Sequence, residues 1–273
     1  MKSTFTVTFL GTGTSQGIPV IGSDHEVCKS TDSKDKRLRV SVLLSWDGFN
    51  FVIDCGPDFR QQMLRENVSK VDGILLTHEH SDHTAGLDDI RPFNFKHGNM
   101  PFYAHKRVFE SLRERFAYIF ATVNKYPGAP SIESVEIDKT TPFTIGGKKV
   151  IPIEAFHDEL PVLGFRVEDF TYLTDVKTIS DEEIEKVRGT KILVINALRE
   201  ELHYSHFNTS EALDLNECYE FVTDDSCGGI SAFVGTVRNH TEKRKVLKLE
   251  FSTYKSMAIK EMQKIAEATI IKF

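Results

Sequence analysis

A short polar run directly after an apolar segment constrains this chain more than any other feature. The run is THEHSDHTAGLDDIR, residues 77–91, and it follows the apolar residues 73–76. Imidazole and carboxylate groups at the end of a buried strand lose hydration, which costs free energy unless a partner binds them. Two divalent metal ions about 3.5–4 Å apart would be such a partner, whereas the alternative is a solvated polar loop. We therefore predict four metal ligands in this run: His78, His80, Asp82 and His83.

The size and charge of the chain limit its class. With 273 residues it can form one large α/β domain, or one domain and a fragment. The formal net charge of −6 argues against binding nucleic acid through bulk electrostatics and favours a small anionic substrate. No apolar run approaches the ~20 residues of a membrane helix, so we expect a cytoplasmic protein without membrane contact. The four cysteines form no CxxC pair, which argues against a disulfide framework or a zinc ribbon.

The sequence HEHSDH followed by TAGLDDIR resembles the HxHxDH signature of the metallo-β-lactamase superfamily. The neighbouring sequence is most similar to its phosphodiesterase branch, which includes the phosphoribosyl cyclic phosphodiesterase and, more distantly, the tRNA 3′-processing endonuclease. The opening FLGTGTSQGIPV, residues 9–20, also resembles this branch, and a hairpin turn is expected at Asp47-Gly48. The resemblance implies an α/β fold for residues 1–214, the αββα four-layer sandwich of the superfamily.

The same resemblance assigns roles to residues outside the motif. His157, before LGFRV, resembles the third histidine ligand, although a lone histidine at a strand end is often a satisfied loop residue. Asp175, in YLTD, resembles the carboxylate that bridges the two metals. Asp54 is implied to orient a ligand histidine through its free ring nitrogen, with a helix cap as its other role. The first ion would bind His78, His80 and His157, and the second would bind Asp82, His83 and the bridging Asp175. Zinc is expected, with manganese or iron as alternatives.

Two residues are implied to have catalytic roles. Asp82 is expected to orient the nucleophile as well as to bind metal. His206, in HYSHFNTSEA, corresponds to a histidine that donates a proton to the departing oxygen, the alternative being a surface histidine. Thr209 or Ser210 is expected to cap the helix that follows.

From residue 215 the sequence resembles a different family. The superfamily would continue with a strand that ends in a histidine ligand of the second metal, and residues 215–273 show no such unit. They resemble instead the first half of the molybdopterin synthase large subunit, through GGISAFVGTVR and KVLKLEFSTY, which predicts a β–β–α unit. Arg238 corresponds to an arginine that binds the anionic pterin precursor, whereas Phe273 precedes the family's catalytic lysine. Water or a neighbouring chain would replace the missing ligand, since the synthase pattern favours a structural role for His240.

The sequence supports three functional hypotheses. The first is a dinuclear metal-dependent hydrolase that acts on small or cyclic phosphodiesters through a hydroxide bridging the metals. The second is a role in molybdenum-cofactor biosynthesis, in which the C-terminal unit docks on the small subunit of molybdopterin synthase or forms a homodimer through the strand at residues 246–251. The third is a thioester or lactam hydrolase, because the same metals serve acyl transfer.

Overall fold

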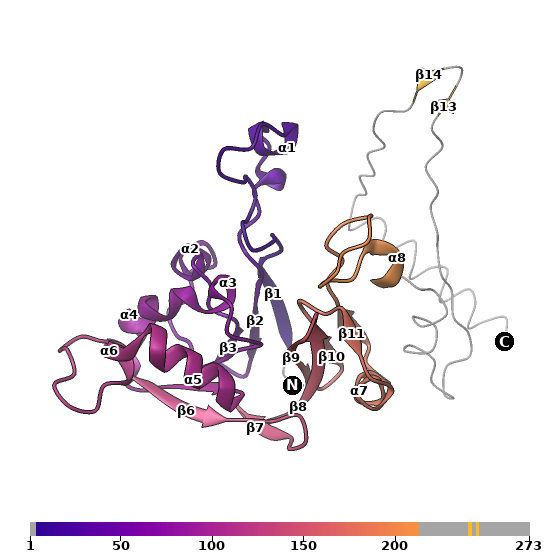
Figure 1. The fold of residues 1–273 in the computed structure, drawn as a ribbon. Helices are drawn as coiled ribbons and strands as arrows, with labels where there is room; N and C mark the ends of the chain where they lie inside the picture. The colour runs from indigo at the N-terminus through magenta and orange to yellow at the C-terminus, as the bar shows by residue number, and fades with distance from the viewer. Residues whose placement is uncertain (1–3, 213–239, 242–243, 246–273) are drawn as a thin grey trace. The chain divides into compact units, whose positions relative to one another are not determined.

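The computed structural model describes residues 4–212, 240–241 and 244–245 (Figure 1). The chain divides into two compact units, Met1–Cys227 and Gly228–Phe273. Two large sheets and every described helix belong to the first unit. Within the described part of the chain, no helix has the length and apolar character needed to cross a bilayer.

The first sheet has six strands in the order of the sequence, β1 to β6. Its antiparallel strands are β1 (Thr6–Gly11), β2 (Ser41–Trp46) and β3 (Phe49–Ile53), and its parallel continuation is β4 (Gly73–Leu75), β5 (Met100–Ala104) and β6 (Ile132–Glu136). β2 and β3 join at Asp47 and Gly48, whose φ angles of 48° and 80° are those of a tight hairpin turn. The predicted hairpin is confirmed.

The second sheet has the order β11-β8-β9-β10-β12, with β7 paired to β8. Its strands are β7 (Phe143–Ile145), β8 (Lys148–His157), β9 (Leu160–Val167), β10 (Phe170–Tyr172), β11 (Thr178–Ile179) and β12 (Ile192–Val194). The β8–β9 pair is the longest ladder and runs from Val150 opposite Val167 to His157 opposite Leu160. This register places His157 at the end of a long, well-paired strand.

Helices cover the outer faces of the two sheets (Figure 1). On the first sheet they are α2 (Phe59–Arg65), α4 (Arg91–His97), α5 (Lys106–Arg115), the shorter α3 (Ser81–Thr84) and α6 (Ala117–Phe120), and the 3₁₀ turn η2 (Ala85–Ile90). On the second sheet, α7 (Asp181–Val187) packs its Val187 with Ile153 and Ala155. Two further short helical turns, α1 (Glu26–Lys29) and η1 (Ser33–Asp35), follow β1, and α8 (Thr209–Ala212) ends the described part of this unit.

Alternating side chains along β2 and β3 build two of the three core layers. Leu43 and Val52 pack under the helices, whereas Leu44 and Phe51 point to the second sheet and meet residues such as Phe165. This period of two is what a strand between two apolar layers requires. Each fully buried side chain of this size contributes about 1.5–3 kcal/mol. The layers therefore follow the order helix, sheet, sheet, helix, and the predicted αββα sandwich is confirmed.

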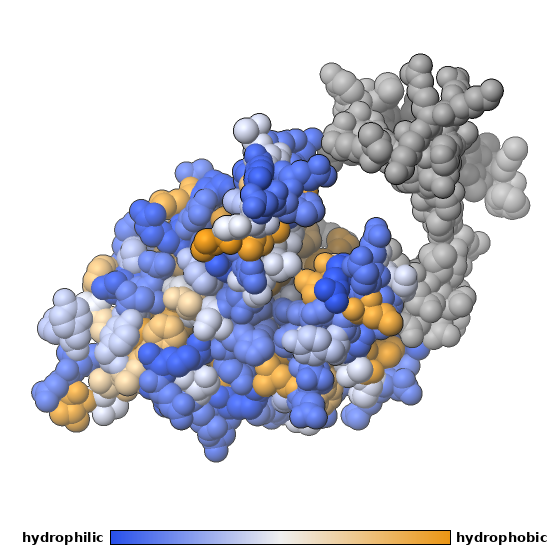
Figure 2. All heavy atoms as spheres, turned by 45° about the horizontal axis from the view of Figure 1, so that its top comes forward, coloured by the Kyte–Doolittle hydropathy of each residue, from blue (hydrophilic) through white to orange (hydrophobic). Residues whose placement is uncertain are grey.

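Figure 2 shows hydrophilic residues over most of the visible face of the first unit, with apolar residues in scattered patches. The second unit is described at β13 (His240–Thr241) and β14 (Arg244–Lys245), which pair antiparallel. Arg238, the strand at residues 246–251 and the rest of the predicted β–β–α unit lie outside the described residues.

Candidate metal centre

The predicted donors meet at one edge of the sandwich, where strands of both sheets end. His78 and His80 follow β4, and α3 carries the next two residues of the motif. From the second sheet, His157 is the last residue of β8, and Asp175 comes shortly after β10. The ring centroid of His157 lies 6.0 Å from that of His78 and 5.5 Å from that of His80. Two sheets that are far apart in sequence thus contribute to one cluster.

Asp54 organises the deep side of this cluster. It follows β3, has a φ of 63° and is fully buried. Its carboxylate accepts hydrogen bonds from the backbone N–H of Thr77 at 2.8 Å, the Thr77 hydroxyl at 2.9 Å and Nδ1 of His83 at 2.7 Å. When the His83 ring is neutral, its proton therefore lies on Nδ1 and its lone pair on Nε2. The helix-cap alternative for Asp54 finds no support here, because Asp58 is the residue that precedes α2.

The free nitrogen of His83 faces two carboxylates. Nε2 is buried and has no hydrogen-bond partner among the described residues. It lies 3.3 Å from Oδ2 of Asp82 and 3.2 Å from Oδ2 of Asp175. Two ligands of a tetrahedral zinc ion, with bonds of about 2.0–2.2 Å, lie about 3.3–3.6 Å from each other. A buried nitrogen without a hydrogen-bond partner among the described residues, this close to two carboxylates, fits a bound metal ion.

Close backbone contacts fix the position of α3. The N–H of Cys55 donates to the carbonyl of His83 at 2.8 Å, and the N–H of Gly86 donates to the carbonyl of Cys55 at 2.8 Å. A Cβ added at Gly56 would lie 1.9 Å from the backbone oxygen of Asp82. Only glycine allows this approach, so the sequence Asp-Cys-Gly after β3 sets the depth of the metal loop.

An ion pair between Glu79 and Arg107 holds the run His78-Glu79-His80 from the outer side of the cluster. The guanidinium of Arg107, in α5, donates to Oε1 of Glu79 and, at 2.5 Å, to the carbonyl of Pro161 in β9. Arg115, in the same helix, donates to the Glu79 carbonyl at 2.6 Å. One arginine thereby links the loop after β4 to the β8–β9 hairpin that carries His157. Sequence reasoning missed this clamp, because nothing in the spacing of Glu79 and Arg107 marks them as partners.

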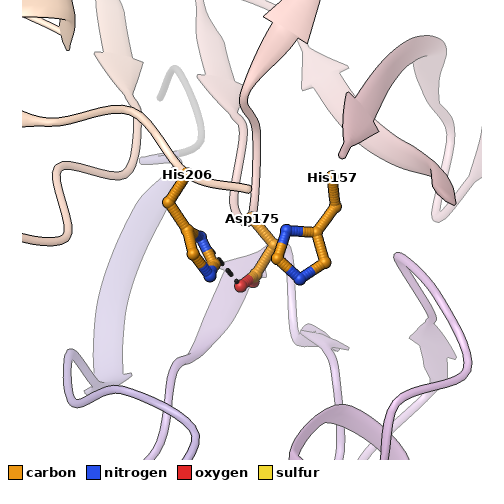
Figure 3. Close-up of side chains that lie close together, drawn as sticks. All are labelled: His157, Asp175 and His206. Atoms are coloured by element: carbon orange, nitrogen blue, oxygen red, sulfur yellow. Dashed lines mark ion pairs between the residues drawn. The ribbon is translucent and has the colours of Figure 1, made fainter. Parts of the chain in front are cut away.

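On the open side of the cluster, His157, Asp175 and His206 point toward one another (Figure 3). One possible ligand atom from each lies within 4.8 Å of those of the other two. Nδ1 of His157 donates to the Ser205 carbonyl at 2.6 Å, which leaves its Nε2 as the acceptor. His206 Nδ1 is 3.5 Å from Oδ1 of Asp175, and its ring centroid is 4.4 Å from that of His157.

The segment between β12 and α8 carries His206 and is held at several points. The N–H of Phe207 donates to the Val176 carbonyl at 2.8 Å, and the side chain of Asn196 bonds both polar backbone atoms of Val176. At the start of α8, the side chains of Asn208 and Glu211 each accept the backbone N–H of the other. This capping box makes Asn208 the cap, so the expectation of Thr209 or Ser210 was wrong.

A cleft of about 670 Å³ opens over the cluster. The glycine-rich segment that begins at the end of β1, residues 11–16, lines one wall. His203 and Tyr204 line the other side together with His206. The two aromatic neighbours of His206 were not predicted, although HYSHF shows His203 three positions before it.

The charges of the site shift its pKa values in opposite directions. Burial lowers the pKa of His78, and burial lowers the pKa of His206 to about 4. Burial also opposes a charge on His83, but Asp175 and Asp54 outweigh it and raise the pKa of His83 well above its usual range. Burial opposes ionisation of Asp175 as well, and there the nearby His83 outweighs it and lowers the carboxyl pKa. Without metal, the deep side therefore holds a buried imidazolium between carboxylates.

This arrangement agrees with what the comparisons with known proteins show. The family model described as "Beta-lactamase superfamily domain" matches residues 49–220, which include every described donor. The chain belongs to this superfamily. As a member of this superfamily, the protein is classed with metal-dependent hydrolases. The predicted family and the prediction of an enzyme are therefore confirmed.

Two relatives of this superfamily protein match most of its first unit. A solved structure of a diphosphatase from the PhnP family is 38% identical, covers 78% of this chain and 82% of its own, and superposes with a TM-score of 0.72. An octanoyltransferase of Porphyromonas gingivalis is 42% identical over 207 residues, which are 75% of this chain and 42% of that protein.

The C-terminal segment of the superfamily protein matches a second family. The model described as "MoaE protein" matches residues 208–273. The molybdopterin synthase catalytic subunit of Drosophila mojavensis is 46% identical over 61 residues, which are 22% of this chain and 17% of that protein. The chain spans less than half the length of either curated relative. The predicted resemblance of the C-terminal segment is confirmed.

Proposed function

We propose that the first unit is a dinuclear phosphodiesterase that hydrolyses small or cyclic phosphodiesters. The observation that carries this proposal is the convergence of imidazole and carboxylate donors from both sheets on one edge, with a buried His83 nitrogen that has no hydrogen-bond partner among the described residues. A structure 38% identical to this chain is called a diphosphatase, which favours phosphoryl over acyl substrates.

The donors divide into two sets that share Asp175. His78, His80 and His157 would hold the first ion, and Asp82, His83 and Asp175 would hold the second, with Asp175 as the bridge. Neutral imidazole and carboxylate suit zinc, and manganese or iron are the alternatives. A bound metal pair would supply an activated water and stabilise the charge that develops on the phosphoryl oxygens.

The chain's own residues position the reaction. Asp54 orients His83 and Ser205 orients His157, each through the nitrogen that does not face the cleft. Asp82, which lines the cleft, would orient the nucleophile. A histidine of the segment 203–206 would give a proton to the departing oxygen, the role that the family resemblance assigns to His206. The glycine-rich segment 11–16 bounds the space for a small substrate.

A substrate comparison on one metal-loaded sample tests this function. We expect hydrolysis of a chromogenic phosphodiester to exceed hydrolysis of a thioester or a β-lactam. His80→Ala should lose this activity, whereas His97→Ala should retain it, because His97 is exposed and its hydrogen bond among the described residues is with the Ser69 carbonyl, at 3.4 Å. A metal-replete sample that cleaves the thioester and not the phosphodiester would favour the acyl alternative, to which the name of the Porphyromonas gingivalis relative points.

The match to the MoaE model supports a second proposal, a docking role in molybdenum-cofactor biosynthesis. We place the boundary between the two domains at residues 214 and 215, where the matches 49–220 and 208–273 overlap. Residues 215–273 would bind the small subunit of molybdopterin synthase or pair with a second copy, and Arg238 would contact an anionic pterin. Co-purification with the small subunit tests the first of these, with Arg238→Ala as the variant for pterin binding. Sulfur transfer by this chain alone would favour a catalytic role over a docking role for residues 215–273.

A further inference from the structure

The segment 203–207 is tied to the metal cluster on both sides of His206. Before it, the Ser205 carbonyl accepts a hydrogen bond from Nδ1 of His157 at 2.6 Å. After it, the N–H of Phe207 donates to the carbonyl of Val176 at 2.8 Å, next to Asp175 in the chain. These two bonds hold the His206 ring close to Asp175 and His157, and Figure 3 shows the three side chains pointing toward one another. Its position is set by the residues that hold the metal.

The His206 ring makes no hydrogen bond to any residue that the structure describes. Within residues 4–212 its Nδ1 has an ion-pair contact with Asp175 at 3.5 Å, which is too long for a good hydrogen bond. That distance is instead the separation of about 3.3–3.6 Å expected for two ligands of one tetrahedral zinc ion. The ligand atoms of His157, Asp175 and His206 lie within 4.8 Å of one another, close enough for the three side chains to hold one ion after small side-chain movements.

From this geometry we infer that His206 is a ligand of the metal centre beside His157 and Asp175, and that His203 then supplies the proton to the departing oxygen. The inference rests on the proposed function and changes the role that the resemblance gave to His206. His240 belongs to the second unit and is not needed for this shell.

His203 has the features of the donor. It lines the same cleft, and its ring centroid is 5.1 Å from that of His206. Its Nδ1 accepts the backbone N–H of Ser205 at 3.2 Å. In the neutral ring the proton therefore lies on Nε2, the nitrogen left to face a substrate.

Cobalt spectroscopy of two matched variants tests the inference directly. His206→Cys and His203→Cys are loaded with cobalt(II), and the wild-type spectrum accounts for the chain's own cysteines. A thiolate bound to cobalt gives a charge-transfer band in the near ultraviolet. We expect this band in His206→Cys and not in His203→Cys. Its absence from His206→Cys, or its presence in both variants, overturns the inference.

Metal content gives an independent measurement. The wild type should bind two zinc ions per chain, and His206→Ala should bind one of them at least tenfold more weakly. His203→Ala should keep both ions and lower kcat without an equal change in zinc affinity. Two equally tight ions in His206→Ala, fewer than two in the wild type, or loss of an ion in His240→Ala instead would each overturn the inference. Wild type that holds two ions but leaves phosphodiesters intact would contradict the proposed function alone.

Discussion

The two sides of the metal cluster are built differently. On the deep side, His78, His83 and Asp54 are fully buried; Asp54 bonds His83, and the His78 ring bonds the Thr77 hydroxyl and the His80 ring, which leaves little freedom. On the open side, His206 is partly exposed and is positioned by backbone bonds of its neighbours. A buried polar group without its partner is costly, whereas a rim residue can be exchanged at small cost to the fold. The deep side therefore constrains the sequence strictly, and the rim is where this chain can depart from its superfamily.

The largest expected effect is on the deep side. Asp54→Ala removes three hydrogen-bond acceptor contacts and leaves Nδ1 of His83 and the backbone N–H of Thr77 without their acceptor in the core. Loss of one partner of a buried pair costs about 3–5 kcal/mol, and loss of a residue that orients a ligand lowers metal affinity about 10–100-fold. Urea unfolding and competition with a chromophoric chelator measure both. Asp54→Asn keeps one acceptor, so its stability and zinc affinity should fall between those of the wild type and those of Asp54→Ala. Wild-type zinc affinity in Asp54→Ala would refute the role of Asp54.

Loss of the Arg107 clamp, which links the loop after β4 to the β8–β9 hairpin, should have the next largest effect. Arg107→Ala leaves the Glu79 carboxylate and the Pro161 carbonyl without their donor, and hydrogen bonds to charged groups are worth about 1.5–3 kcal/mol. Zinc should also dissociate faster, because the loop and the β8–β9 hairpin lose their link. Lys106→Ala is the control in the same helix: its ion pair with Glu110 is exposed, and its loss should cost less than about 0.5 kcal/mol. Equal effects of the two variants would show that the clamp has no special role.

Zinc binding should release a proton from the deep side of the cluster and none from the open side. The raised pKa of His83 means that the metal-free protein holds a proton there at neutral pH, and zinc must displace it. His206, whose pKa is lowered to about 4, is already neutral and releases none. Apparent zinc affinity should therefore rise with pH by up to about tenfold, or 1.4 kcal/mol, per pH unit below the pKa of His83. Calorimetry in buffers of different ionisation enthalpy measures the released proton, and a heat independent of the buffer would contradict this account.

The smallest expected effect is at the rim. Asn208→Ala removes one half of the capping box of α8 and should cost about 1 kcal/mol. Ser210→Ala, at an exposed position of the same helix, should be nearly neutral. Thermal unfolding measures both. A larger loss in Ser210→Ala would restore the cap that the sequence suggested.

Much of the prediction rested on the spacing of residues that lie close together in the sequence. HEHSDH after an apolar strand pointed to the donors, and Asp47-Gly48 between two apolar runs pointed to the hairpin. Asn208 was missed because asparagine, threonine and serine in a row all make good caps, and only the position of Glu211 decides between them. Arg107 was missed for another reason: its partners lie 28 and 54 residues away, and no local period links them.

Anomalous diffraction at the zinc edge, on crystals grown with zinc, tests the central claim most directly. The account predicts two peaks about 3.5–4 Å apart, one among His78, His80 and His157 and one among Asp82, His83 and Asp175. A zinc-replete crystal with no peak at this edge of the sandwich, or with zinc bound only elsewhere, would contradict it.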